Sequence, residues 1–212
     1  MRTDDFIKAL AADRTIERHA VARALLLAAP LAAAFSALWF LGLEGVRAGI
    51  ATPDTLAIVA RKLAFTGSLA LVAGFFALRA ARPQGVDGRA FAALVLPLAV
   101  LAYMVARETA AFGMVDWRAR MMGEFSWRCT LSIVLMAAPL LAALLWAQSK
   151  GAPDQPVGAG ALAGLAATGL AASIYALHCT DDSALFVLLW YVLAGALAAA
   201  AGALAARRAL AW

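Results

Sequence analysis

Six stretches of this chain contain no Asp, Glu, Lys, Arg or His, and they constrain its fold more than any other feature. They cover residues 24–43, 63–78, 91–106, 131–147, 157–177 and 185–206. A membrane-spanning helix needs about 20 apolar residues, with a range near 17 to 25. Apolar residues make up 65% of the chain and its mean hydropathy is +0.84, well above the values of a soluble domain. The sequence therefore predicts an all-α integral membrane protein, a bundle of six transmembrane helices.

The flanks of the shorter stretches must complete their helices. We expect helices at about 23–43, 60–79, 89–107, 128–148, 157–177 and 185–206, in one membrane domain that covers 23–212. The flanks carry cationic side chains that can bury their stems and return their charges to the interface, namely Arg61, Lys62, Arg79, Arg107 and Arg128. The longest segment between spans, residues 107–127, is expected to form a flap at the membrane surface.

Basic residues predict the orientation of the bundle. An even number of spans places both termini on one side, and cytoplasmic segments carry an excess of Lys and Arg. With the N-terminus inside, the cytoplasmic segments hold 11 Lys and Arg and the outer segments hold 7. This excess predicts cytoplasmic termini. Because the basic residues are scattered at helix ends, the net charge of +5 does not indicate direct nucleic-acid binding.

Residues 1–22 precede the first span and are expected to form a cytoplasmic segment with a short amphipathic helix. Thr3 can cap this helix, Asp4 and Asp5 suit its N-terminal dipole, and one apolar stripe holds Phe6, Ile7, Leu10 and Ala11. An isolated helix of about ten residues is marginal in water. It therefore lies on the bilayer as a juxtamembrane helix, folds back on the bundle, or binds a protein partner. Its acidic character favours the partner, since interfacial anchors carry basic polar faces.

Small residues recur at four-residue spacing in the last two spans. Gly160, Gly164 and Thr168 lie on one face of the fifth span, and Ala198 and Gly202 do likewise in the sixth. Such faces let helix backbones approach closely in a membrane. We expect these residues to pack the helices of one chain together rather than to form a dimer.

Cys129 and Cys179 are the main candidates for chemistry. The predicted topology puts Cys129 at the outer start of the fourth helix and Cys179 at the outer end of the fifth, at heights that differ by about 6 Å. A short turn makes these helices antiparallel neighbours. The pair could form a disulfide, or bind a soft metal with His178 as a third ligand and Asp181 and Asp182 nearby. The alternative is that both cysteines are small apolar fillers of the core.

Other classes of function find less support in the sequence. No enzyme is expected, because no nucleophile, base and oxyanion set can be assembled and no cofactor motif is present. Transporters usually carry ionisable groups at membrane depth, which the six stretches lack. A small transporter or exporter and a non-catalytic scaffold subunit remain open as alternatives.

Several motifs resemble the NrsF family of bacterial membrane anti-sigma factors. They are Ser126-Trp127-x-Cys129, the run 138–146 that leads to Lys150-Gly-Ala-Pro153, the segment 175–183, the sequence Leu189-Trp190-Tyr191, and the N-terminal run 3–11. The resemblance covers essentially the whole chain. It implies that the N-terminal segment holds a sigma factor of the extracytoplasmic-function (ECF) class at the inner membrane. It also implies that two periplasmic cysteines take part in sensing heavy-metal or oxidative stress.

Overall fold

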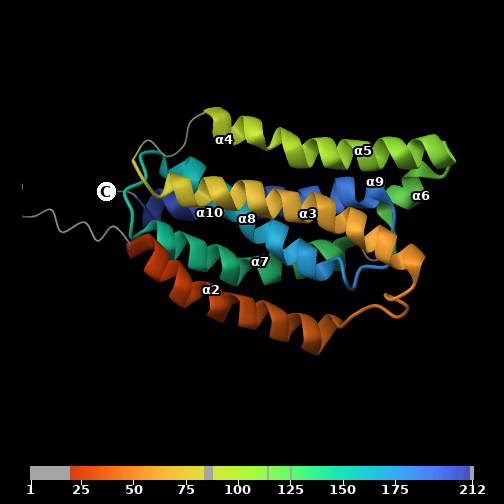
Figure 1. The fold of residues 1–212 in the computed structure, drawn as a ribbon, viewed down its shortest axis with the longest axis horizontal. Helices are drawn as coiled ribbons and strands as arrows, with labels where there is room; N and C mark the ends of the chain where they lie inside the picture. Colours follow the sequence, from red (N-terminus) through yellow and green to blue (C-terminus); the bar gives the residue numbers. More distant parts are fainter. Residues whose placement is uncertain (1–19, 84–87, 114, 125, 211–212) are drawn as a thin grey trace, which may run out of the picture.

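The fold is that of a computed structural model that describes residues 20–83, 88–113, 115–124 and 126–210 (Figure 1). All regular structure in these residues is helical, and six helices are long and apolar enough to cross a membrane. The prediction of an all-helical chain with six such helices is confirmed. The predicted amphipathic helix and its residues Thr3 to Ala11 lie outside the described residues.

The helices follow one another in a simple up-and-down order. α2 (Ala20–Trp39) continues into a π-helical turn, η1 (Phe40–Glu44). Then come α3 (Pro53–Ala80), α4 (Gly88–Ala93), α5 (Val95–Phe112), α6 (Trp117–Met122), α7 (Ser126–Gln148) and α8 (Pro156–Tyr175). The last span consists of α9 (Ala184–Phe186), a π-helical segment η2 (Val187–Tyr191) and α10 (Val192–Ala209).

Two helices extend beyond a bound that the apolar pattern predicts. α3 begins at Pro53, seven residues before the expected start at 60, because proline suits the first turn of a helix and Thr52 is extended. α5 runs to Phe112 and ends where Gly113 adopts a positive φ of 64°. Much of the segment 107–127 is therefore helical, in the last turns of α5 and in α6.

α8 lies at the centre of the bundle and packs against α3, α7 and α10. Its small residues allow this. A Cβ atom on Gly160 would overlap the carbonyl group of Gly202, and one on Gly164 would overlap that of Ala198, so α8 and α10 touch backbone to backbone. Thr168 is buried and its hydroxyl donates to the Gly164 carbonyl at 2.9 Å. The close contact of Gly169 with α3 was not anticipated from the sequence.

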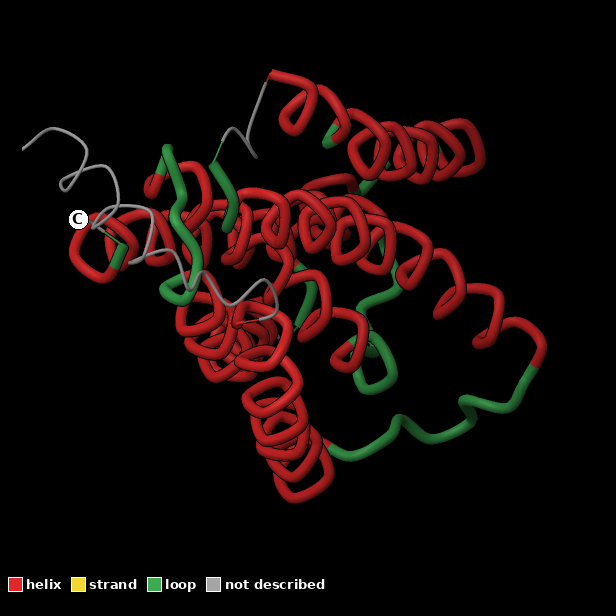
Figure 2. Tube along the Cα trace, turned by 60° about the vertical axis from the view of Figure 1, so that its left-hand side comes forward, coloured by secondary structure: helices red, strands yellow, loops and turns green. Residues whose placement is uncertain are grey.

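α4 and α5 lie along one side of the bundle and are its least buried part (Figures 1 and 2). Only 11% of the apolar window of this span is buried inside the protein, against 61% for α8. The start of α2 and the end of α10 lie at one end of the bundle (Figure 1). We call the other end, which holds the start of α7 and the end of α8, the thiol end, because both cysteines lie there.

Candidate functional site

The two cysteines meet at the thiol end. Cys129 lies in the first turn of α7, and Cys179 lies four residues after the end of α8. The two side chains are 0% and 4% exposed, and both are free thiols. The Cys129 thiol donates a hydrogen bond to the sulfur of Cys179. Helix geometry and one short turn thus bring together two residues that are 50 positions apart in the chain.

Two cations hold the backbone at Cys179. Its carbonyl oxygen accepts hydrogen bonds from Arg47 Nη1 and from Lys62 Nζ, both at 3.0 Å. Both cations also bind the Asp182 carboxylate, at 2.7 Å from Arg47 and 3.2 Å from Lys62. Arg47 comes from the turn after η1 and Lys62 from α3. The segment that carries Cys179 is therefore clamped to two other parts of the bundle.

Lys62 does not behave as the sequence predicted. Its side chain is 1% exposed and turns inward to Asp182, whereas we expected it to return its charge to the membrane interface. Burial of an ammonium group is costly unless the group is paired and hydrogen-bonded, and Asp182 with the Cys179 carbonyl meets that need. Arg61, the next residue in the chain, stays exposed.

This environment changes the acidity of two groups in the segment after α8. The hydrogen bond from Cys129 lowers the pKa of the Cys179 thiol, and the charge of Lys62 lowers this pKa further. Burial raises the same pKa, but by less, so the net shift is downward. Burial also raises the pKa of Asp182, but the hydrogen bond from Arg47 and the charge of Lys62 outweigh burial and hold it below its usual value. A thiol with a lowered pKa is a better nucleophile and metal ligand at neutral pH, since the thiolate is the reactive form.

The other predicted residues of this site have structural partners. His178 Nδ1 lies 3.0 Å from the Gly45 carbonyl oxygen, and its Nε2 lies 3.2 Å from the Glu44 carboxylate. Asp181 accepts a hydrogen bond from the Glu124 backbone N–H at 3.2 Å. Within the described ranges, no three His, Cys, Asp or Glu side chains are grouped so that they could hold a metal ion. With both ring nitrogens engaged, His178 is not placed as the third ligand beside the two thiols.

A cavity of about 270 Å³ lies next to the two thiols. Its lining comprises Arg128, Cys129, Tyr175, His178, Cys179, Thr180 and Asp181. A small solute such as a peroxide or a metal ion fits a space of this size. The arrangement can therefore form a disulfide or bind a two-coordinate soft metal through the paired sulfur atoms.

A second, partly buried polar group holds the start of the last span. Glu108 of α5 accepts hydrogen bonds from the Ser183 hydroxyl and the Ala184 backbone N–H, and it pairs with Arg120 of α6. Sequence analysis did not single out Glu108, Arg120, Arg47 or Glu44. The sequence offers one indication of these contacts. The acidic pair Asp181-Asp182 and several basic residues fall in segments on the same predicted side of the membrane.

Comparison with known proteins shows which family the chain belongs to. The family described as "Negative regulator of sigma F", NrsF, matches residues 10–212. The "Probable anti-sigma-F factor NrsF" of Azospira oryzae is 33% identical over the full length of both chains. The "Anti-sigma-F factor NrsF" of Caulobacter vibrioides is 34% identical over 197 residues, 91% of each chain. No solved structure matches the chain. The chain therefore belongs to the NrsF family of negative regulators and is a non-catalytic regulator rather than an enzyme.

Proposed function

We propose that this protein is an anti-sigma factor that holds an ECF sigma factor at the bacterial inner membrane and releases it when stress chemistry occurs at Cys129 and Cys179. The names of both relatives support a sigma factor as the partner. The observation that carries the sensing part is the buried, hydrogen-bonded thiol pair beside a cavity. Cys129 and Cys179 lie at the start of α7 and just after the end of α8, and this end of the bundle is opposite the start of α2 (Figure 1).

Two reactions of the thiol pair fit the site. An oxidant such as a peroxide would take two electrons and two protons from Cys129 and Cys179, so that an S–S bond forms and the peroxide O–O bond is reduced to water or an alcohol. A soft divalent metal ion such as cadmium would instead displace the two thiol protons and bind both sulfur atoms. Either reaction replaces the hydrogen bond between the thiols and changes the position of the Cys179 backbone.

The contacts of Cys179 suggest how such a change would cross the bilayer. Its carbonyl is bound by Lys62 of α3 and by Arg47, which follows η1 at the end of α2. α2 runs back along the bundle to Ala20, which belongs to the proposed sigma-binding segment 1–22. A tenfold loss of affinity for the sigma factor requires only about 1.4 kcal/mol of differential stabilisation between two states. A small shift of α2 and α3 would suffice.

The proposed sigma-binding residues are Thr3, Asp4, Asp5, Phe6, Ile7, Leu10 and Ala11. The test is co-purification of the sigma factor with the full-length protein from membranes, against a protein that lacks residues 2–13. A triple variant with Phe6, Ile7 and Leu10 changed to Ala should also lose the partner. The variant Lys8→Ala, off the apolar stripe, should keep it. If the sigma factor stays bound after the deletion, the N-terminal assignment is wrong.

The sensing part is tested separately with Cys129→Ser, Cys179→Ser and the double variant. Because either reaction needs both sulfur atoms, each variant should lose induction of the sigma regulon by cadmium or by an oxidant. Each should still bind the sigma factor in unstressed cells. A double variant with an undiminished stress response would show that the thiols are fillers of the core.

The proposed orientation places both termini in the cytoplasm and both cysteines at the periplasmic face. A membrane-impermeant thiol reagent should label Cys129 or Cys179 in intact spheroplasts after the site is opened by mild denaturant. A phosphatase reporter at the C-terminus should stay inactive. Labelling only after membrane lysis, or an active C-terminal reporter, would show that the orientation is opposite to the proposed one.

A further inference from the structure

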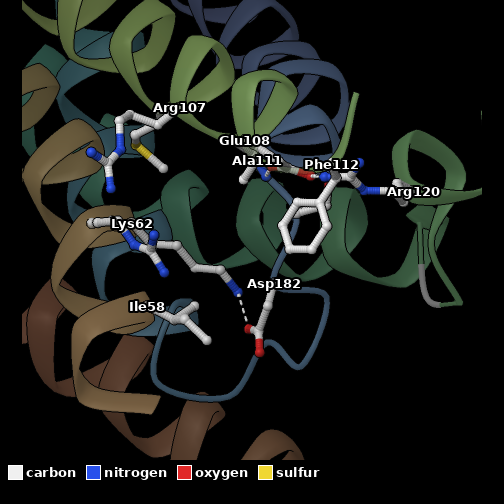
Figure 3. A pocket seen from close by; sticks show the side chains of 12 residues that line it. Ile58, Lys62, Arg107, Glu108, Ala111, Phe112, Arg120 and Asp182 are labelled. Carbon is white, nitrogen blue, oxygen red and sulfur yellow. Dashed lines mark hydrogen bonds and ion pairs between the residues drawn. The ribbon is translucent and has the colours of Figure 1, made fainter. Parts of the chain in front are cut away.

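A second cavity, of about 460 Å³, lies at the thiol end between α3 and α5 (Figure 3). It is larger than the cavity beside the thiols and has different walls. Its lining comprises Ile58, Arg61, Lys62, Met104, Arg107, Glu108, Ala111, Phe112, Arg120, Asp182, Ser183 and Ala184. A cavity of this size matches sites for small ligands in proteins. The sensing proposal uses Lys62 and Asp182 but not the cavity itself.

The walls of this cavity carry an excess of positive charge. Four of the lining residues are cations and two are carboxylates. Both carboxylates are already paired, Asp182 with Lys62 and with Arg47, and Glu108 with Arg120. In the part of the chain that the structure describes, Arg61 and Arg107 form no ion pair. Two arginine charges therefore line the cavity without a carboxylate partner among the described residues, and they favour an anionic ligand.

Hydrogen-bond donors at this cavity also remain free. Toward the described residues Arg61 donates only from its Nε, to the Ala57 carbonyl at 3.2 Å. The buried Nη1 atom of Arg120 has no hydrogen-bond partner among the described residues. Guanidinium groups bind phosphate oxygens through paired N–H donors, and several around one cavity favour a phosphate group over a chloride ion.

The depth of the cavity in the bilayer indicates the source of that phosphate. In α3, 19 residues separate Arg61 from Ala80, which corresponds to about 28 Å along a helix. The hydrocarbon core of a bilayer is about 30 Å thick. If the end of α3 lies at one surface of this core, Arg61 and Lys62 lie at the other, where lipid phosphates are found. In α5, Arg107 lies five residues before the helix ends at Phe112.

The apolar part of the lining agrees with an amphiphilic ligand. Ile58, Met104 and Phe112 contribute to the same walls as the arginines. The neighbouring α5 is mostly exposed along its length, so acyl chains can lie against it in the bilayer. We propose that this cavity binds the phosphate headgroup of an anionic phospholipid, with Arg61 and Arg107 as its main ligands. The proposal does not depend on sigma-factor binding or on thiol chemistry.

The test is lipid binding to the full-length protein in detergent, followed by native mass spectrometry. Phosphatidylglycerol should bind at least tenfold more tightly than phosphatidylcholine. The double variant R61Q/R107Q should lose about tenfold in affinity for phosphatidylglycerol. The matched control R207Q/R208Q lies in the last turn of α10, at the other end of the bundle from the cavity. It removes the same amount of charge and should bind phosphatidylglycerol as the wild type does. Inorganic phosphate at millimolar concentration should not displace the lipid.

Three results would overturn the proposal. They are equal binding of the two lipids by the wild type, equal binding by R61Q/R107Q and the wild type, and full displacement of the lipid by inorganic phosphate. The last result would assign the cavity to a free anion. If R61Q/R107Q does not fold, the comparison of the two lipids on wild-type protein still decides the question.

Discussion

Lys62 offers the sharpest test of how the thiol end works. Its buried ammonium group donates to the Cys179 carbonyl at 3.0 Å and to Asp182 at 3.2 Å. Replacing it with Met keeps much of the side-chain volume and removes the charge. Because this charge helps to lower the pKa of Cys179, the substitution Lys62→Met should raise that pKa and reduce the thiolate fraction at neutral pH.

The expected size follows from the contacts. An opposite charge within about 4 to 6 Å shifts a pKa by about 1 to 3 units. We take the lower end, since Lys62 binds the carbonyl rather than the sulfur and Asp182 cancels part of its charge. A rise of one unit lowers the thiolate fraction about tenfold at a pH below the pKa. At neutral pH the reduction is about twofold, because the pKa of Cys179 is about 6. Loss of a partner from a buried pair costs about 3 to 5 kcal/mol. Asp182 keeps Arg47 and is 31% exposed, so we expect about 2 kcal/mol of destabilisation.

The assay is the rate of Cys179 alkylation as a function of pH, with the labelled residue identified by mass spectrometry. The rate for Lys62→Met should fall about tenfold near pH 5 and about twofold at neutral pH, and it should match the wild type at alkaline pH. Arg79→Met is the matched control, because Arg79 is an exposed residue near the opposite end of the same helix. An unchanged rate profile in Lys62→Met, with the protein folded, would refute the role given to this charge.

Two further predictions concern stability. Gly164→Val should lower the free energy of unfolding by about 3 kcal/mol, because a Cβ atom there overlaps the backbone of α10. Gly67→Ala in α3, where an added Cβ atom meets no neighbour within 4 Å, should be neutral or stabilising by up to about 1 kcal/mol. Thermal unfolding in detergent measures both, and an equal effect of the two substitutions would contradict the close contact of α8 with α10. Asp182 contributes stability above its usual pKa, and this is lost as the pH falls through its lowered folded value. Asp182→Asn should therefore be less stable than wild type at neutral pH and lose less stability on acidification, and parallel stability curves against pH would contradict the ion-pair assignment.

Charged side chains at the thiol end bear on the alternative that the protein is a small transporter. The six apolar stretches hold no charged residue, but Lys62 and Glu108 enter the bundle from their flanks. Each is bound by residues next to the last span, Asp182 in one case and Ser183 with Ala184 in the other. These contacts hold the segment after α8 in place. They therefore support a structural role in a regulator better than a path for an ion across the bilayer.

The sequence alone determined the helical class, the six spans and the residues that pack α8 against α10. These features follow from local rules, because an apolar run in lipid must form a helix and small residues at four-residue spacing form one face. Counting residues along two antiparallel helices also sufficed to place Cys129 and Cys179 at one end.

Only the tertiary structure decided which charged groups surround the thiols. Lys62, Arg47 and Asp182 come from three segments that no local pattern connects, and a lysine at the flank of a span could equally have turned to the membrane surface. The direction of the lysine side chain depends on whether a carboxylate lies within hydrogen-bond distance inside the bundle. That depends on how the helices pack, and helix packing sums many weak contacts that a single sequence does not display.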